Sequence, residues 1–288
     1  MLNKACRFRQ ALTIGARRSA MRIDMHTHTT ASDGLLTPTE LVKKAFEKRL
    51  DGIAITDHDS VDALEEAIEK SMDYKGFLVI PGVEMGCNYD EEEVHILGYF
   101  IDYKDVRLRD TLSSLKNSRW DRGILILDKL IQLGLSIPKD KILEKSRETG
   151  FIGRATIARE LVNNGHVRDV NEAFDKYLDV GKPAYVDRYK LSVGDTINLI
   201  HDCGGVSVLA HPGILKNKDI MTYCVKRGIM GIECYHSKHT KSDEKMVKSF
   251  AERNGLIQTG GSDFHGEKDI LGDYSTDIST IPTLRERL

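Results

Sequence analysis

Short apolar segments alternate along the chain with longer segments of helical periodicity. Each apolar segment has the length of a buried strand, contains β-branched residues and ends in polar residues, which is typical of a sheet covered on both faces. The predicted strands lie at residues 22–25, 52–56, 77–83, 94–100, 206–210, 231–234 and 256–259. Because strands and helices alternate, the pattern predicts an α/β protein with a mainly parallel sheet, either open or closed into a barrel.

Helix signals lie between the predicted strands. The segment 37–40 (Thr-Pro-Thr-Glu) combines a capping box with a proline at the first helical position, and an apolar stripe follows it. Asp59 or Ser60 is predicted to cap the next helix, and Ser192 with Asp195 to open a later one. Helix ends are predicted near Gly204, Gly228 and Gly255.

The alternation stops between about residues 102 and 191, where helical patterns replace the strand signal. We therefore expect a barrel or sheet domain at residues 21–101 and 192–288, with a helical insertion at 102–191 seated on it. Residues 1–20 form an expected N-terminal extension. It holds five basic residues and no acid, as a transit peptide does, but no apolar segment follows, so an extension before the first strand is the preferred interpretation.

Composition excludes several classes of protein. With 42 Lys and Arg against 44 Asp and Glu, the formal net charge of −2 argues against a protein that coats duplex nucleic acid. The 40% hydrophobic and 30% charged residues exclude disorder as the main state, and no apolar run reaches the roughly 18 residues of a membrane span. Five cysteines without a C-x-x-C pair disfavour disulfides and thiolate zinc sites, and predict a reducing cytoplasm.

Histidines and carboxylates follow the predicted strands, mostly where each strand ends. The candidates are His26, His28, Asp33, His58, Glu84, His95, His211, Asp263 and His265. Because the carboxyl ends of parallel strands meet at one rim, we expect these side chains to converge. So many buried imidazoles and carboxylates require cations, and nitrogen and oxygen ligands without sulfur suit Mn²⁺, Zn²⁺ or Fe²⁺. The sequence predicts a multinuclear metal site.

The other histidines carry weaker signals. His95 alone, within an apolar strand, would be an ordinary core residue, and only the whole set makes it a ligand candidate. His166 and His201 lie in helical segments and are predicted to be structural. His236 and His239 follow a predicted strand on the same rim, where either a role towards substrate or a solvated loop fits the sequence.

The motifs around the candidate ligands resemble those of the polymerase and histidinol phosphatase (PHP) superfamily of metal-dependent phosphoesterases. They are Asp24-Met25-His26-Thr27-His28, Thr56-Asp57-His58, Pro81-Gly82-Val83-Glu84, His95-Ile96-Leu97-Gly98, Leu209-Ala210-His211-Pro212 and Gly261-Ser262-Asp263-Phe264-His265. The resemblance covers residues 21–266 and implies a distorted seven-stranded β/α (TIM-like) barrel. It also implies two to three divalent ions.

The resemblance assigns candidate ligands to each ion. The first ion would be held by His26, His28, Glu84 and Asp263. The second would share Glu84 and add His95 and His211. The third would be held by Asp33, His58 and His265. Asp57 and Asp59 would orient ligands through hydrogen bonds. Catalysis is assigned to His26, His28, Glu84, Asp263 and His236.

Two segments of the insertion indicate which branch of the superfamily the chain resembles. Residues 153–158 and 181–186 are similar to the branch that includes nucleoside 3′,5′-bisphosphate phosphatases and 5′-to-3′ exoribonucleases, although Ala155 and Thr156 stand where that branch often has Pro-His. The implied reaction is hydrolysis of phosphate monoesters of nucleotides or short oligoribonucleotides by a metal-activated hydroxide. Expected substrate contacts are Arg154, Lys182, Arg188 and His236.

Three alternatives stay open at this point. A histidinol-phosphate phosphatase uses similar motifs, and a noncatalytic metal-binding PHP module would keep the fold but is expected to lose ligands. An amidohydrolase also begins with H-x-H at a barrel strand, yet it usually needs a lysine on a middle strand, and no predicted strand end offers one.

Overall fold

The computed structural model describes residues 20–90, 92–149, 151–266 and 268–288. All predicted strands are present: β1 (Arg22–Thr27), β2 (Gly52–Ile55), β3 (Leu78–Tyr89), β4 (Glu92–Tyr99), β6 (Val206–Leu209), β7 (Gly231–His236) and β8 (Ile257–Gly261). Two short strands escaped prediction, β5 (Leu191–Ser192) and β9 (Thr276–Asp277). With two residues each, they have too little pattern to be found in a sequence.

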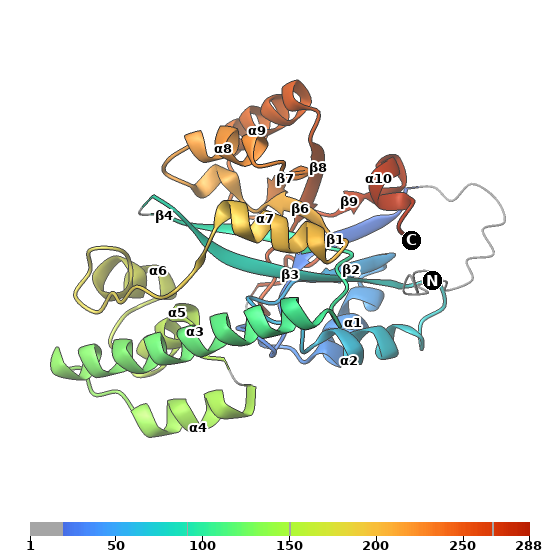
Figure 1. The fold of residues 1–288 in the computed structure, drawn as a ribbon. Coiled ribbons are helices and arrows are strands. Elements are labelled where there is room, and N and C mark those ends of the chain that lie inside the picture. The colour runs from blue at the N-terminus through green and yellow to red at the C-terminus, as the bar shows by residue number, and fades with distance from the viewer. Residues whose placement is uncertain (1–19, 91, 150, 267) are drawn as a thin grey trace.

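The strands form a sheet in the order β8-β7-β6-β4-β3-β2-β1-β9. Most neighbours are parallel, but β4 runs antiparallel to both β3 and β6. The two sides of the sheet meet where Thr27, at the end of β1, pairs with Phe264, just after β8. The sheet is therefore a nearly closed barrel, which confirms the predicted α/β barrel fold (Figure 1).

Among the helices that pack on the barrel are α1 (Pro38–Glu47), α2 (Leu64–Ser71), α7 (Val193–Asp202), α8 (Asp219–Lys226) and α9 (Lys241–Asn254). The capping box of α1 is confirmed, because Thr37 accepts from the Glu40 amide while Glu40 accepts from the Thr37 amide at 2.8 Å. The predicted cap of α2 is wrong. That helix begins after Ala63 without a side-chain cap, and Ser60 instead accepts from the Asp62 amide in the preceding turn.

Glycine ends the predicted helices as expected. Gly255 adopts φ 63° at the end of α9, and Gly204 and Gly228 adopt φ 73° and 83° just after α7 and α8. These left-handed conformations are open to glycine at little steric cost. The chain after β8 adds a 3₁₀ turn at Ile278–Thr280 and a short helix α10 (Pro282–Arg285).

Helices alone lie between β4 and β5 in the described part of that segment. They are α3 (Val106–Gln132), α4 (Lys139–Thr149), α5 (Arg154–Asn163), α6 (Val170–Ala173) and a π-helical turn at Phe174–Leu178. Helix α3 runs alongside the barrel and extends past it, with α4, α5 and α6 around its outer half (Figure 1). These helices share an apolar cluster that includes Leu127, Leu130 and Leu161. The division into a barrel and an inserted subdomain stays a prediction, and residues 1–19 lie outside the described residues.

Two further sequence inferences concern the chain as a whole. In the described residues, no helix has the length and apolar character needed to span a membrane. Cys87, Cys203, Cys224 and Cys234 are free thiols in buried positions. Cys6 falls outside the described part of the chain.

Candidate metal centre

The structure brings the nine predicted ligands together at one mouth of the barrel, in what we call the histidine–carboxylate cluster. His26 and His28 enter it from β1 and the residue that follows, and both are fully buried. His26 Nε2 lies 3.3 Å from Glu84 Oε2 and 3.6 Å from Asp263 Oδ1. His28 Nε2 lies 3.4 Å and 3.2 Å from the same two oxygens. These four residues each present a ligand atom within 4.8 Å of the others.

Glu84 lies at the centre of the cluster, on β3. Its Oε1 is 2.8 Å from His95 Nδ1 and 3.1 Å from His211 Nε2, while its Oε2 is 2.9 Å from His58 Nδ1. His95 is near the start of β4, not at its end, because β4 is antiparallel and its amino end reaches the rim. The rule that ligands follow parallel strands therefore does not account for His95, although the residue is in place.

Asp33, His58 and His265 form the third predicted group. His265 Nε2 is 3.2 Å from Asp33 Oδ1, and His58 Nε2 is 3.9 Å from Asp33 Oδ2. Together with His28, these residues present ligand atoms within 4.8 Å of one another. Asp57 holds the loop that carries Asp33: it accepts from the Thr29 amide and hydroxyl and from the Ser32 hydroxyl.

The backbone is strained at this mouth. His211 adopts φ 30°, Asp263 φ 54° and Asp59 φ 48°, all in the left-handed region that side chains other than glycine rarely enter. Such strain persists only where surrounding contacts hold it, and it concentrates at functional sites.

Burial and mutual contacts shift the protonation of the cluster strongly. Burial alone would lower the pKa of His26, but Glu84, Glu233 and Asp263 raise that pKa well above its ordinary value. Burial lowers the pKa of His28 to about 3, and that of His211 to about 4. These opposing shifts show a group of sites that cannot all keep their ordinary charge in one dehydrated pocket.

The cluster fits bound cations. Several of its buried atoms lie close to one another but make no hydrogen bond of acceptable angle among the described residues: His26 Nε2, His28 Nδ1 and Nε2, Asp33 Oδ1, His58 Nδ1, Glu84 Oε2 and His211 Nδ1. Buried polar atoms without partners are costly unless a ligand satisfies them. The donor set of imidazole nitrogens and carboxylate oxygens is one that divalent transition metals prefer.

Glu233 is a buried member of this region that the sequence reasoning missed. It lies on β7, is fully buried, and its Oε1 is 3.1 Å from His26 Nδ1. The available signal was a lone acid inside the apolar segment 231–234, because a buried carboxylate in a strand needs a partner.

His236 and His239 have different roles in the structure. His236 is fully buried and faces the cluster, with Nε2 3.4 Å from Asp263 Oδ2. Lys238 reaches the same carboxylate oxygen with Nζ at 2.9 Å. Both ring nitrogens of His239 bind backbone, the Gly213 amide and the Cys234 carbonyl, so this ring ties two loops together.

Two arginines converge on Asp59, beside the histidine–carboxylate cluster. Arg119 Nε on α3 donates to Asp59 Oδ2 at 2.6 Å, and Arg188 Nη2 donates to the same oxygen at 3.1 Å. Asp59 Oδ1 accepts from the Gly86 amide. A Cβ at Gly86 would lie 2.6 Å from Arg188 Nη2, so only glycine lets the guanidinium approach this backbone.

A second carboxylate, Glu93 on β4, gathers further arginines. Arg154 Nη2 donates to Glu93 Oε2 at 2.8 Å, Arg122 Nη1 lies 4.0 Å from that oxygen, and Arg188 Nη2 is 3.4 Å from Glu93 Oε1. We call this group the arginine cluster: Arg119, Arg122, Arg154 and Arg188. Lys182, also predicted to contact substrate, lies exposed in the turn after the π-helix.

The remaining histidines agree with the structural roles expected from the sequence. His166 Nε2 is 2.8 Å from the Ser136 carbonyl oxygen, just after α5, and His201 Nε2 is 2.9 Å from the Ser207 hydroxyl. Each ring links two neighbouring segments away from the histidine–carboxylate cluster.

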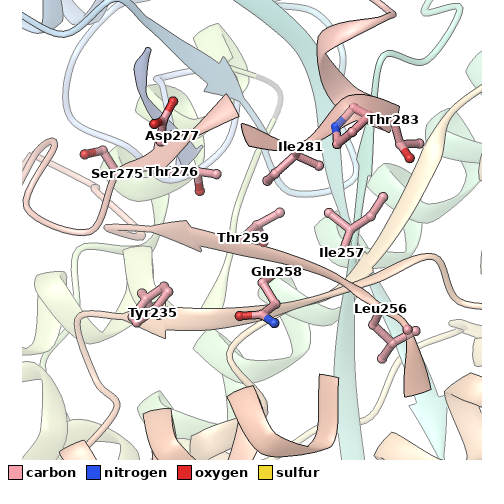
Figure 2. Close-up of a pocket in the computed structure, with 12 residues that line it drawn as sticks. Tyr235, Leu256, Ile257, Gln258, Thr259, Ser275, Thr276, Asp277, Ile281 and Thr283 are labelled. Atoms are coloured by element: carbon pink, nitrogen blue, oxygen red, sulfur yellow. The ribbon is translucent and has the colours of Figure 1, made fainter. Parts of the chain in front are cut away.

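A separate groove opens on another side of the barrel, between β8 and the segment 275–283 (Figure 2). Its volume is about 490 Å³, and Tyr235, Ile257 and Thr276 are among the residues that line it. None of the nine predicted ligands lines this groove. The histidine–carboxylate cluster and the arginine cluster thus lie outside this groove.

Fold and cluster together define a β/α barrel that carries, at its mouth, groups of histidines and carboxylates that could hold metal ions. Comparison with known proteins agrees, since the PHP domain family matches residues 24–184. The chain belongs to the PHP domain family.

Relatives with known names share most of the chain. It is 34% identical to a 3′,5′-nucleoside bisphosphate phosphatase of Chromobacterium violaceum, over 92% of this chain and 95% of that protein. It is also 34% identical to the 5′-3′ exoribonuclease Rnm of Salmonella typhimurium, over 85% and 86%. Among solved structures, an amidohydrolase from Chromobacterium violaceum with bound sulfate and no metal has a TM-score of 0.84 and 32% identity, covering 92% and 96%.

Proposed function

We propose that this protein is a metal-dependent phosphoesterase that hydrolyses phosphate monoesters of nucleotides. Its preferred substrates are nucleoside 3′,5′-bisphosphates or short oligoribonucleotides. One observation carries the proposal: a cluster of residues that could hold cations lies directly beside a cluster of four arginines that share two carboxylates. Glu93, which binds the arginines, is 3.9 Å from the predicted ligand His95.

The histidine–carboxylate cluster would hold the reacting phosphate. His26, His28, Glu84 and Asp263 form the predicted first ion site, and Glu84 also faces His95 and His211 of the second. When bound, divalent ions such as Mn²⁺, Zn²⁺ or Fe²⁺ neutralise phosphoryl oxygens and lower the pKa of a bound water. His236 and Lys238 both face Asp263 at the same mouth, so they are positioned to contact the substrate.

The arginine cluster supports a substrate with a second phosphate. Four guanidiniums surround two carboxylates, Asp59 and Glu93, which leaves excess positive charge. Arg119 Nη2, Arg122 Nε and Arg188 Nε are buried without a hydrogen-bond partner in the described structure. Burial and the neighbouring guanidiniums lower the pKa of Arg122 to about 9 against the attraction of Glu93. A phosphate dianion beside the partly exposed Arg154 would balance this excess charge.

Binding at the phosphate that does not react would position the one that does. We expect Arg154 to provide the main contact, because its side chain is partly exposed whereas those of Arg119, Arg122 and Arg188 are buried. Arg188 is buried behind it, and Lys182, on the exposed turn, could add charge. The relative named as a bisphosphate phosphatase supports this substrate class.

The direct test is phosphate release by the purified chain supplied with Mn²⁺. Release from adenosine 3′,5′-bisphosphate should be faster than from AMP at equal concentration. Equal rates on both would remove the bisphosphate claim, and no release from any phosphate ester would remove the enzyme claim. Histidinol phosphate belongs in the same assay, because its preferential hydrolysis would favour that alternative.

A second candidate substrate is a short RNA that the protein would shorten from its 5′ end. The similarity to proteins named 5′-3′ exoribonuclease favours it. A 5′-phosphorylated oligoribonucleotide of a few nucleotides should be shortened from its 5′ end by the Mn²⁺-loaded protein if this candidate holds. An intact oligonucleotide together with rapid bisphosphate hydrolysis would exclude it.

A further inference from the structure

A β-bulge in β7 turns two polar side chains into the barrel. Glu233 pairs with Thr259 of β8 and Tyr235 with Gly260, so one extra residue stands in β7. In a regular strand, residues 233 and 235 would share a face and residue 236 would point away. Instead, Glu233 and His236 are both fully buried, while Tyr235 is 37% exposed and lines the outer groove (Figure 2).

Both oxygens of Glu233 contact predicted ligands. Oε1 lies 3.1 Å from His26 Nδ1, and Oε2 accepts from the His211 backbone amide at 2.8 Å. His26 and His211 enter from β1 and from the residues after β6, and the sequence resemblance assigns them to different ions. Glu233 therefore contacts one predicted ligand of the first ion and one predicted ligand of the second.

The geometry points to Glu233 as a positioning residue for two metal ligands, not as a ligand itself; this rests on the proposed metal centre. Its carboxylate takes the Nδ1–H of His26, which leaves Nε2 to face Glu84 and Asp263. It also holds the amide of His211, whose backbone is in the strained left-handed region at φ 30°.

The rival interpretation makes Glu233 a ligand. Glu233, His26 and His236 do present atoms within 4.8 Å of one another. However, both Glu233 oxygens already have partners, and His26 turns Nδ1 towards Glu233 but Nε2 towards the histidine–carboxylate cluster. An ion between Glu233 and His236 would compete with those contacts for the same two oxygens.

The Glu233→Gln variant separates these roles. Its amide keeps the size of the side chain but can no longer accept from both partners. If the amide NH₂ faces His26, Nδ1 must accept, and the proton moves to Nε2, the atom that should bind the ion. If the NH₂ faces His211 instead, two donors oppose each other.

The experiment measures Mn²⁺ affinity and stoichiometry of metal-free protein by titration calorimetry. We expect Glu233→Gln to weaken binding about 10- to 100-fold with unchanged stoichiometry. Tyr99→Phe is the matched control, because the Tyr99 hydroxyl is buried near Glu233 and the carboxylate contacts stay intact. Its affinity should equal that of the wild type. Glu233→Asp, which keeps the charge but is too short to reach both partners, should fall between the two.

A structural readout completes the test. In zinc-loaded wild-type protein, ¹⁵N spectra should show His26 protonated at Nδ1 and coordinated through Nε2. Unchanged affinity in Glu233→Gln, or a stoichiometry lower by one ion, would overturn the inference. If the Glu233→Gln variant does not fold, the Mn²⁺ affinity and stoichiometry of the Glu233→Asp variant provide the same test. Weakened metal binding in a protein without phosphatase activity would sink the proposed function and leave this inference standing.

Discussion

The histidine–carboxylate cluster and the arginine cluster adjoin each other but have opposite electrostatic requirements. In the first, imidazole nitrogens and carboxylate oxygens face a common centre, which is an environment that favours cations. In the second, four guanidiniums share two carboxylates, which is an environment that favours anions. A site that favours cations next to a site that favours anions suits a ligand with two phosphates, one held through metal ions and the other by arginines.

Removal of the central carboxylate should have the largest effect. Glu84→Gln takes a charge from contact with His26, His95 and His211, so we expect loss of bound metal and a fall in phosphate release of about 10³-fold or more. Elemental analysis and initial rates check this. Glu172→Gln, on α6 in an ion pair with the exposed Arg168, is the control that should change neither. A Glu84→Gln protein with full metal content would contradict the comparison.

Loss of an arginine should affect binding more than chemistry. Arg154→Met removes a charged hydrogen-bond donor worth about 1.5–3 kcal/mol, so the KM for a 3′,5′-bisphosphate should rise about 10- to 100-fold. The KM for a monophosphate and the metal content should stay the same. Arg168→Met, with 84% of its side chain exposed, is the matched control. An equal rise in KM for both substrates would show that the two clusters are not separate.

Metal uptake should depend on pH. Burial lowers the pKa of His95 and His265, but Glu84 and Asp33 respectively raise each pKa to about 9. In metal-free protein these rings therefore hold protons at neutral pH, and an entering ion must displace them. Mn²⁺ affinity should rise between pH 6 and 9, with proton release visible in calorimetry across buffers of different ionisation enthalpy. Affinity that is flat over this range would contradict the assignment of both rings as ligands.

The smallest effect should come from a change outside both clusters. Thr37→Ala removes the cap of α1 and should lower the free energy of unfolding by about 1 kcal/mol. Metal content and both KM values should remain at wild-type levels. Thermal unfolding of the metal-free and metal-loaded forms measures this, and Thr240→Ala at the capping box of α9 is a parallel case.

Local signals carried most of the fold prediction. The strands and the glycine helix ends were readable because each depends on a few adjacent residues. The cap of α2 was not, since Asp59 is occupied by Arg119 and Arg188 from distant parts of the chain. A long-range ion pair thus outweighed the local preference for capping, and the sequence alone could not show that.

For the candidate site too, local motifs could be recognised in the sequence but long-range contacts could not. Most of its histidines and acids could be predicted because they lie near strand ends and form motifs. His95 is different: β4 is antiparallel to β3, so it is the amino end of β4 that brings this residue to the rim. Glu233 was missed, because its neighbours are His26 and His211, far away in sequence. The arginine cluster was found only in part, since Arg119 and Arg122 look like ordinary polar positions of a long helix.

The antiparallel course of β4 has a mechanical consequence. Glu93 and His95 are two residues apart on one face of this strand, so one short piece of backbone carries a guanidinium anchor and a predicted metal ligand. Because β4 is paired with β3 on one side and β6 on the other, the sheet fixes the position of the carboxylate that holds Arg154 relative to His95.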